Sequence, residues 1–392
     1  MKRHTGNKRI VSLAALTALA VAQAAIVVRA SAAEPKAAEA QAEAQRVADN
    51  MLLYQRPSGG WPKDINMSKQ LTPEQAAKMK KQKAAMSAKG GAHGDTLDNG
   101  ATFSQIRHLV RVYTACAAAG RKGERIDAYK AAALKGIDYV LAAQYDNGGW
   151  PQIPNARGYH AHITFNDNVT TNALNLLQDI VEKKPDFAFV DDQRRAKAAR
   201  AVKKGIECVL KCQYVLNGKK TAWCQQHDEK TFEPRPARSY EIPSLTAAES
   251  VGVVRFLMRL DKPSKEVIQA VQDAVAWLDG PAKLEGLRQV VKKDASKPKG
   301  WDKLIVKDPS APPMWARFYY IGTLGGGGRK LMDENVKIGQ WIVGDRDGKI
   351  YTSLEKISHE RRTGYSWFGQ WPAKLLAEEY PAWRKKWLPG SD

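Results

Sequence analysis

Apolar side chains recur every three to four residues through most of the chain, a spacing that places them on one face of an α-helix. Alternating apolar and polar runs, the pattern of strands, are few and short. The sequence therefore predicts an all-α protein. The helical pattern is clearest near residues 101–119, 126–144, 168–182, 192–214, 244–260 and 265–279.

A repeated motif follows some of these helices. Gln-Arg-Pro-Ser-Gly-Gly-Trp61-Pro-Lys recurs as Gln-Tyr-Asp-Asn-Gly-Gly-Trp150-Pro-Gln, and a weaker copy runs from Gln213 to Trp223. Repeats of helix, Gly-rich turn and Trp loop indicate successive hairpins around an axis. We expect an α/α barrel, or toroid, as a single domain over residues 34–392. A simpler interpretation is that each motif only ends a helix and buries its Trp as a plug.

Two long segments, 285–314 and 323–345, are rich in Gly, Lys and Pro and do not fit a helical pattern. We interpret them as loops, which in compact domains are usually functional when they are long. In a barrel of hairpins, the loops gather at one end. There they would form a substrate groove.

The N-terminal residues have the layout of a signal peptide over 1–33: a basic start, an apolar run from Ile10 to Val28 and small residues around Ala30. A membrane anchor is the alternative. No other apolar stretch is long enough to span a bilayer. We expect a secreted or periplasmic protein that acts as a monomer and has no membrane contact after cleavage.

The formal net charge is +21, and only five of the positive side chains lie in the leader. The mature protein thus stays strongly basic, which indicates a polyanionic partner: nucleic acid, an acidic membrane surface or an acidic polysaccharide. Charge alone does not choose among them. Four cysteines, Cys116, Cys208, Cys212 and Cys224, leave both disulfides and buried thiols open, while their spacing disfavours zinc.

Aspartate and asparagine stand together at two predicted helix starts, Asp98 with Asn99 and Asp167 with Asn168. Carboxylate and amide oxygens suit a hard cation such as Ca²⁺. Helix capping is the alternative, since Asp and Asn cap helices routinely. Asp98 and Asp167 are our candidates for metal ligands.

Several arginines lie among aromatic residues and glycines. Guanidinium groups bind carboxylates through two hydrogen bonds, and aromatic faces such as that of Tyr365 stack on sugar rings. Each arginine has a structural ion pair as its alternative, which Arg346, between two aspartates, illustrates best. The set comprises Arg235, Arg238, Arg317, Arg346 and Arg361.

Taken together and in order, these segments resemble the pectate lyases of polysaccharide lyase family 10. The likeness extends from Gly59 to Pro372. It rests on Gly-Gly-Trp-Pro-Lys63-Asp, Asp98-Asn, Phe-Asn-Asp167-Asn, Trp-Cys-Gln-Gln-His227-Asp, Pro-Ala-Arg238-Ser-Tyr-Glu, Trp-Ala-Arg317-Phe-Tyr, Arg346-Asp-Gly and Glu-Arg361-Arg.

The resemblance implies an α/α barrel enzyme that cuts polygalacturonate, with no nucleic-acid partner. It implies that Asp98 and Asp167 bind Ca²⁺ together with the substrate carboxylate and that Arg238 is the general base. Arg317, Arg346 and Arg361 would hold uronate carboxylates, and Lys63 would be a further contact. We also expect Asn99, Arg235 and Tyr365 to contact substrate. The long insertion from Leu324 to Val336 separates Arg317 from Arg346 more than the family pattern does.

The implied reaction is a β-elimination, in which positive charge stabilises the enolate formed when the C5 proton leaves. An arginine accepts a proton only when neutral, so we expect nearby cations to lower the pKa of Arg238 and the optimum to be alkaline. Two alternatives stay open. One is a non-catalytic protein that binds acidic polysaccharide, and the other is an α/α-barrel glycoside hydrolase that uses Asp98 and Asp167 as its carboxyl pair.

Overall fold

The structure is a computed structural model that describes residues 36–86 and 94–389. The predicted signal peptide, residues 1–33, lies outside the described residues, and so its prediction is not tested. Within them, no helix combines the length and the apolar character needed to cross a bilayer.

Six long helices pack as consecutive pairs, α3 with α4, α5 with α6 and α7 with α8. All six were predicted from the sequence, with ends that differ by a few residues. A helix over residues 36–54 and the shorter α2, Pro73–Ala84, precede them, and α9, His359–Gly364, and α10, Tyr380–Trp387, follow. The six are α3 Phe103–Ala118, α4 Glu124–Ala142, α5 Val169–Val181, α6 Asp192–Cys212, α7 Ala247–Met258 and α8 Lys265–Asp279.

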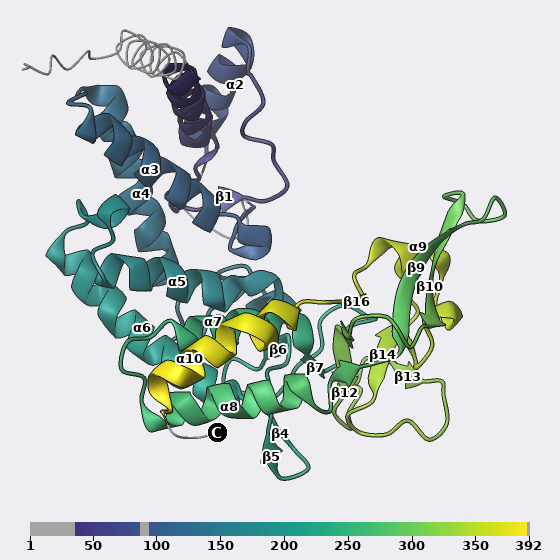
Figure 1. Cartoon of the computed structure of the whole chain (residues 1–392). Coiled ribbons are helices and arrows are strands. Elements are labelled where there is room, and N and C mark those ends of the chain that lie inside the picture. Colours follow the sequence, from purple (N-terminus) through teal and green to yellow (C-terminus); the bar gives the residue numbers. More distant parts are fainter. Residues whose placement is uncertain (1–35, 87–93, 390–392) are drawn as a thin grey trace, which may run out of the picture.

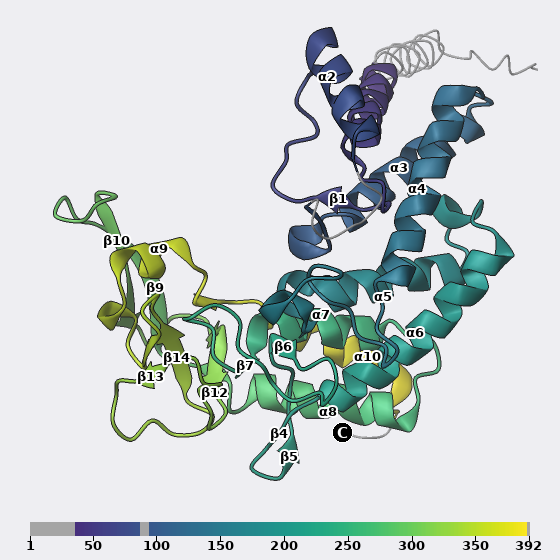
Figure 2. The same cartoon turned by 180° about the vertical axis from the view of Figure 1, so that it is seen from behind.

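These helix pairs are layered one on another, and a strand-rich region lies at one side of the last pair (Figures 1 and 2). Helices make up 47% and strands 15% of the structure, and the helices do not close into a barrel. The prediction of an all-α toroid is therefore wrong: the protein is a mixed α/β structure. Its helical hairpins are real, but the chain after α8 forms sheets instead of closing a ring.

The strands are short except in one hairpin, β9 Leu287–Lys293 with β10 Trp301–Lys307. A sheet in the order β13-β15-β14-β12-β7 and a smaller one in the order β16-β11-β8 form the rest of the strand-rich region. The bounds are β7 Ser244–Thr246, β8 Lys283–Leu284, β11 Met314–Ala316, β12 Phe318–Tyr320, β13 Lys330–Leu331, β14 Trp341–Gly344, β15 Lys349–Tyr351 and β16 Phe368–Gly369.

Three two-stranded ladders lie in the loops between helices. They pair β1 Trp61–Pro62 with β2 Asp95–Thr96, β3 Ile163–Thr164 with β6 Gln226–His227, and β4 Val215–Leu216 with β5 Lys219–Lys220. The segments 285–314 and 323–345, predicted as loops, thus contain strands β9, β10, β13 and β14. That part of the prediction is wrong.

The repeated motif holds the helix pairs together in the same way three times. Gln55, Gln144 and Gln213 each donate from Nε2 to two carbonyl oxygens at 2.9 Å, one in their own loop and one on a later helix. The acceptors are Gly59 and Ala132, Gly148 and Ala201, and Thr221 and Ala270. The weak third copy is therefore a structural copy.

The tryptophans of the three copies, Trp61, Trp150 and Trp223, are fully buried. Each indole Nε1 donates to a carbonyl of the preceding helix, at 2.8, 2.9 and 2.7 Å. The interpretation of Trp61 and Trp150 as plugs is thereby confirmed. Their loops pack tightly, since a Cβ on Gly148 would lie 2.0 Å from the carbonyl oxygen of Lys204.

The four cysteines are buried free thiols. Of the two alternatives that the sequence left open for them, the structure shows buried thiols and no disulfide among these four residues. These side chains contribute to the core of the helical pairs.

Candidate active site

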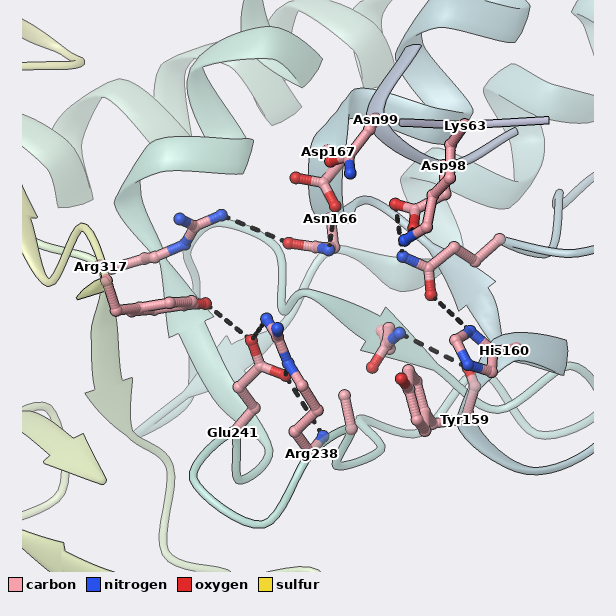
Figure 3. Close-up of a pocket in the computed structure, with 14 residues that line it drawn as sticks. Lys63, Asp98, Asn99, Tyr159, His160, Asn166, Asp167, Arg238, Glu241 and Arg317 are labelled. Atoms are coloured by element: carbon pink, nitrogen blue, oxygen red, sulfur yellow. Dashed lines mark hydrogen bonds and ion pairs between the residues drawn. The ribbon is translucent and has the colours of Figure 1, made fainter. Parts of the chain in front are cut away.

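A cavity of about 180 Å³ lies where the loops before α3, α5 and β7 meet the strand-rich region. Figure 3 shows its lining, which combines acids, amides and cations. Of the sequence-predicted residues, the structure brings together Lys63, Asp98, Asn99, Asp167, Arg238, Arg317 and Tyr365. The others in the lining are Gln152, Tyr159, His160, Asn166, Gln226, Ala237 and Glu241.

The acidic wall comes from two short 3₁₀ turns, η1 Asp98–Gly100 before α3 and η3 Asn166–Asn168 before α5. Asn99 and Asp167 occupy the same left-handed backbone, each with φ of 51°. The N-caps of α3 and α5 are Thr102 and Asn168, and neither makes a side-chain cap bond. The capping alternative is therefore not what the structure shows for Asp98 and Asp167, which instead border the cavity.

The carboxyl groups of Asp98 and Asp167 lie close enough to affect each other's pKa. Burial and the neighbouring Asp98 raise the pKa of Asp167 to about 7. Burial acts in the same direction on Asp98, but contact with Lys63 and a 2.7 Å bond from Gln152 Nε2 to Asp98 Oδ1 hold its pKa below the usual value. The wall thus concentrates acidic groups, and Lys63 balances Asp98 through an ion pair.

Arg238 forms the opposite side of the site (Figure 3). Its Nε and Nη2 donate to Glu241 at 2.7 and 2.5 Å, and its guanidinium lies 4.8 Å from the ring centre of Tyr240. Burial works to lower the pKa of Arg238, but the carboxylate of Glu241 outweighs it and holds this pKa above the usual range. The expectation that surrounding cations lower this pKa is wrong for this structure, because an anion is the nearest charged neighbour.

Arg317 lies between β11 and β12, where its guanidinium stacks 5.0 Å from the ring centre of Tyr365. It is held by an ion pair with the buried Glu249 and a 3.3 Å bond from Nη2 to Asn166 Oδ1. Tyr365 donates from its hydroxyl to Glu241 Oε1 at 2.7 Å. Both arginines of the cavity are thus fixed in place by buried carboxylates.

Three predicted arginines lie outside the lining of the cavity. Arg235 pairs with Asp228 at 2.8 Å, and Arg346 pairs with Glu360 at 3.0 Å. Arg361 also pairs with Glu360 and is buried, with its guanidinium 4.6 Å from the ring centre of Tyr240. Each makes the structural ion pair that the sequence left open, and their role in substrate binding stays a prediction.

Sequence reasoning missed several residues of the lining. Gln152 had a signal, because it follows Trp-Pro in the second motif as Lys63 does in the first, and both contact Asp98. Its Oε1 meets His160 Nδ1 at 2.9 Å. Since Gln152 Nε2 donates to Asp98, its Oε1 accepts and His160 Nδ1 donates. Tyr159 and His160 come from a short 3₁₀ turn, Gly158–Ala161, which is too brief to carry a periodic apolar pattern.

Comparison with known proteins decides the family. The chain matches the family described as pectic acid lyase over residues 55–376. It belongs to that family. This pectic acid lyase is similar to the solved family 10 polysaccharide lyase of Cellvibrio cellulosa, with 31% identity and a TM-score of 0.67 over 88% of this chain and 95% of that one. No curated protein matches the chain.

A second solved structure is a mutant of the same Cellvibrio cellulosa lyase in complex with trigalacturonic acid. It shares 31% identity and a TM-score of 0.66 with this pectic acid lyase, over 87% of this chain and 92% of that one. The resemblance to family 10 lyases is therefore confirmed, and the chain is a lyase. Membership of a lyase family argues against the alternative of a non-catalytic binding protein.

Proposed function

We propose that this lyase cleaves α-1,4-linked polygalacturonate by β-elimination and releases unsaturated oligogalacturonates. The observation that carries the proposal is one cavity lined on one side by Asp98 and Asp167 and on the other by Arg238 and Arg317. A uronate unit would use both sides, because a cation held by the acids and the guanidinium groups of the arginines would together offset the charge that develops on its carboxylate when C5 loses a proton. The similar lyase solved with trigalacturonic acid supports this substrate.

The acidic pair fits Ca²⁺. Two carboxylates meet beside the amide groups of Asn99 and Asn166, which is the hard oxygen set that this ion prefers. Asp98 and Asp167 would hold it, and Lys63 would move from Asp98 to an anionic group of the substrate. Bound there, Ca²⁺ would supply positive charge to the uronate carboxylate as the enolate develops.

A second group of ligand-type atoms, from His162, Asp228 and Glu229, lies within 4.8 Å of one another. Its atoms already have partners: Asp228 accepts from Arg235 and two backbone amides, and Glu229 meets His162 at 3.0 Å. None of the three lines the cavity. We therefore assign the cation to Asp98 and Asp167.

Arg238 is the group that we propose takes the C5 proton. It lines the cavity, and Tyr240 and Tyr365 confine its guanidinium. Because Glu241 favours the charged form, Arg238 becomes a base only at alkaline pH or when its contact with Glu241 loosens. Arg317, fixed by Glu249, would bind a uronate carboxylate in both ground and transition states.

The glycoside hydrolase alternative is disfavoured by geometry. Its two catalytic carboxyl groups stand about 5 to 9.5 Å apart on either side of the scissile bond. Asp98 and Asp167 instead lie on the same side of the cavity, close enough for Asp98 to raise the pKa of Asp167, so they do not flank a sugar from opposite sides. Only a lyase makes a conjugated double bond that absorbs in the ultraviolet.

The test is an ultraviolet assay of the purified chain on polygalacturonate. We expect absorbance to rise with Ca²⁺, to stop in excess chelator and to return when Ca²⁺ is restored. Full activity in excess chelator would show that the assignment of Asp98 and Asp167 is wrong. Shorter chains without the absorbing product would indicate hydrolysis, and binding without cleavage would indicate a binding protein.

A further inference from the structure

The β9–β10 hairpin extends away from the strand-rich region (Figure 1). Its antiparallel register pairs Trp301 with Lys293 and Lys303 with Val291. Directly paired residues, and residues two apart on one strand, point to the same face. These four side chains therefore share one face of the hairpin, which we call the lysine face.

The lysine face begins beside the active site. Lys303 Nζ donates at 3.4 Å to the backbone oxygen of Tyr365, a residue of the cavity lining. The hairpin is fixed there, because Asp302 accepts two 2.7 Å bonds from Arg362 of α9 and both side chains are buried. The face is thus held at a set position next to the cavity.

Positive charge gathers toward the end of the hairpin. Lys293, Lys297 and Lys299 lie in or beside its turn, and Lys299 Nζ is 5.6 Å from the ring centre of Trp301. The acid of this turn, Asp294, accepts bonds from the amide and hydroxyl of Ser296, at 3.0 and 2.6 Å. Its carboxylate is therefore already used by the turn itself.

We propose that the lysine face, together with Lys297 and Lys299, binds the polygalacturonate chain outside the cavity. This rests on the proposed function. A polymer is longer than a cavity of about 180 Å³, so the rest of the chain must leave over a neighbouring surface. The lysine face offers cations and an aromatic ring next to Tyr365, which complements a chain with a carboxylate on every sugar.

The test removes three charges, as Lys293→Gln, Lys297→Gln and Lys299→Gln together. We expect KM for long polygalacturonate to rise about fivefold or more at low ionic strength, since several exposed charges act on one polyanion. The difference from the unchanged protein should shrink with added salt, because screening weakens exposed pairs. Activity on trigalacturonate, which offers only three carboxylates for exposed lysines to attract, should change by less than about twofold.

The matched control removes three charges from the exposed face of α6, as Lys197→Gln, Lys203→Gln and Lys204→Gln. It should leave KM for the polymer within about twofold. An unchanged KM in the hairpin variant, or an equal rise in the α6 variant, would overturn the proposal. The proposal would also be overturned if the hairpin variant lost binding to anionic phospholipid vesicles while its kinetics on the polymer stayed unchanged. That result would assign the surface to a membrane. If the unchanged protein does not cleave polygalacturonate at all, the proposed function fails instead.

Discussion

Arg238 and Arg317 contact the same tyrosine but are expected to act differently. We predict that Arg238→Ala lowers kcat by at least about a hundredfold, the usual effect of losing a positioned base, and leaves oligogalacturonate affinity within a few-fold. Arg317→Ala should weaken binding as well as rate. Steady-state kinetics together with calorimetric binding would check both. If Arg238→Ala kept a near-normal kcat with a raised KM, Arg238 would be a substrate clamp.

Glu241 gives a test of the base by pH. Its carboxylate stabilises the charged form of Arg238, so Glu241→Gln removes that stabilisation and lowers the pKa of Arg238. The neutral base then appears at lower pH, and we predict that the rise of kcat with pH shifts to lower pH. Glu182→Gln, which changes a carboxylate that pairs with Lys184 and Arg259 outside the cavity lining, is the control. An equal loss of kcat at every pH would mean that Glu241 only positions Arg238.

Among the loops, the Gly-rich turns allow a matched pair of substitutions. Gly148 and Gly158 both have positive φ, 96° and 65°, but only Gly148 has a neighbour where a Cβ would lie. We predict that Gly158→Ala costs roughly 1 to 2 kcal/mol of unfolding free energy. Gly148→Ala should cost about 1 to 3 kcal/mol more, as overpacking does. Denaturant unfolding would measure both, and equal costs would show that the loop moves away from α6.

The helices could be predicted because each carries its own repeating apolar pattern. α8 begins and ends at the predicted residues, 265 and 279. Most strands could not be predicted, since a strand of two to four residues has no pattern of its own and depends on a distant partner. β12, for example, pairs with β7 more than seventy residues earlier in the chain. The prediction of a closed ring was wrong for the same reason. The repeats predicted helical hairpins, but no local pattern shows whether successive hairpins close into a ring.

The site was predictable mainly through family resemblance. Asp98, Asp167, Arg238 and Arg317 meet in one cavity although they lie in four separate segments. Residue types alone left capping open for the two aspartates and ion pairing open for the two arginines. Glu241 illustrates what was missed, because the effect of its carboxylate on Arg238 depends on a contact that only the folded loop creates.

The charge of the whole chain, +21 before any cleavage of a leader, agrees with an anionic polymer as substrate. We predict faster turnover of polygalacturonate than of highly methyl-esterified pectin, because an ester has no charge for a guanidinium or Ca²⁺ to pair with. The measurement compares kcat/KM on substrates of matched length and graded esterification. Faster turnover of the esterified polymer would contradict the proposed roles of the cavity cations.

The two 3₁₀ turns have a consequence for the symmetry of the molecule. Asn99 and Asp167 share one backbone conformation, so they are equivalent positions of successive repeats, and Asp98 corresponds to Asn166. The two acids that meet in the cavity are therefore not symmetry mates. Each repeat contributes one acid and one amide, in opposite order along the chain. With this order, both acids line the same cavity. The helix pairs repeat regularly, whereas the active site depends on a difference between two of the repeats.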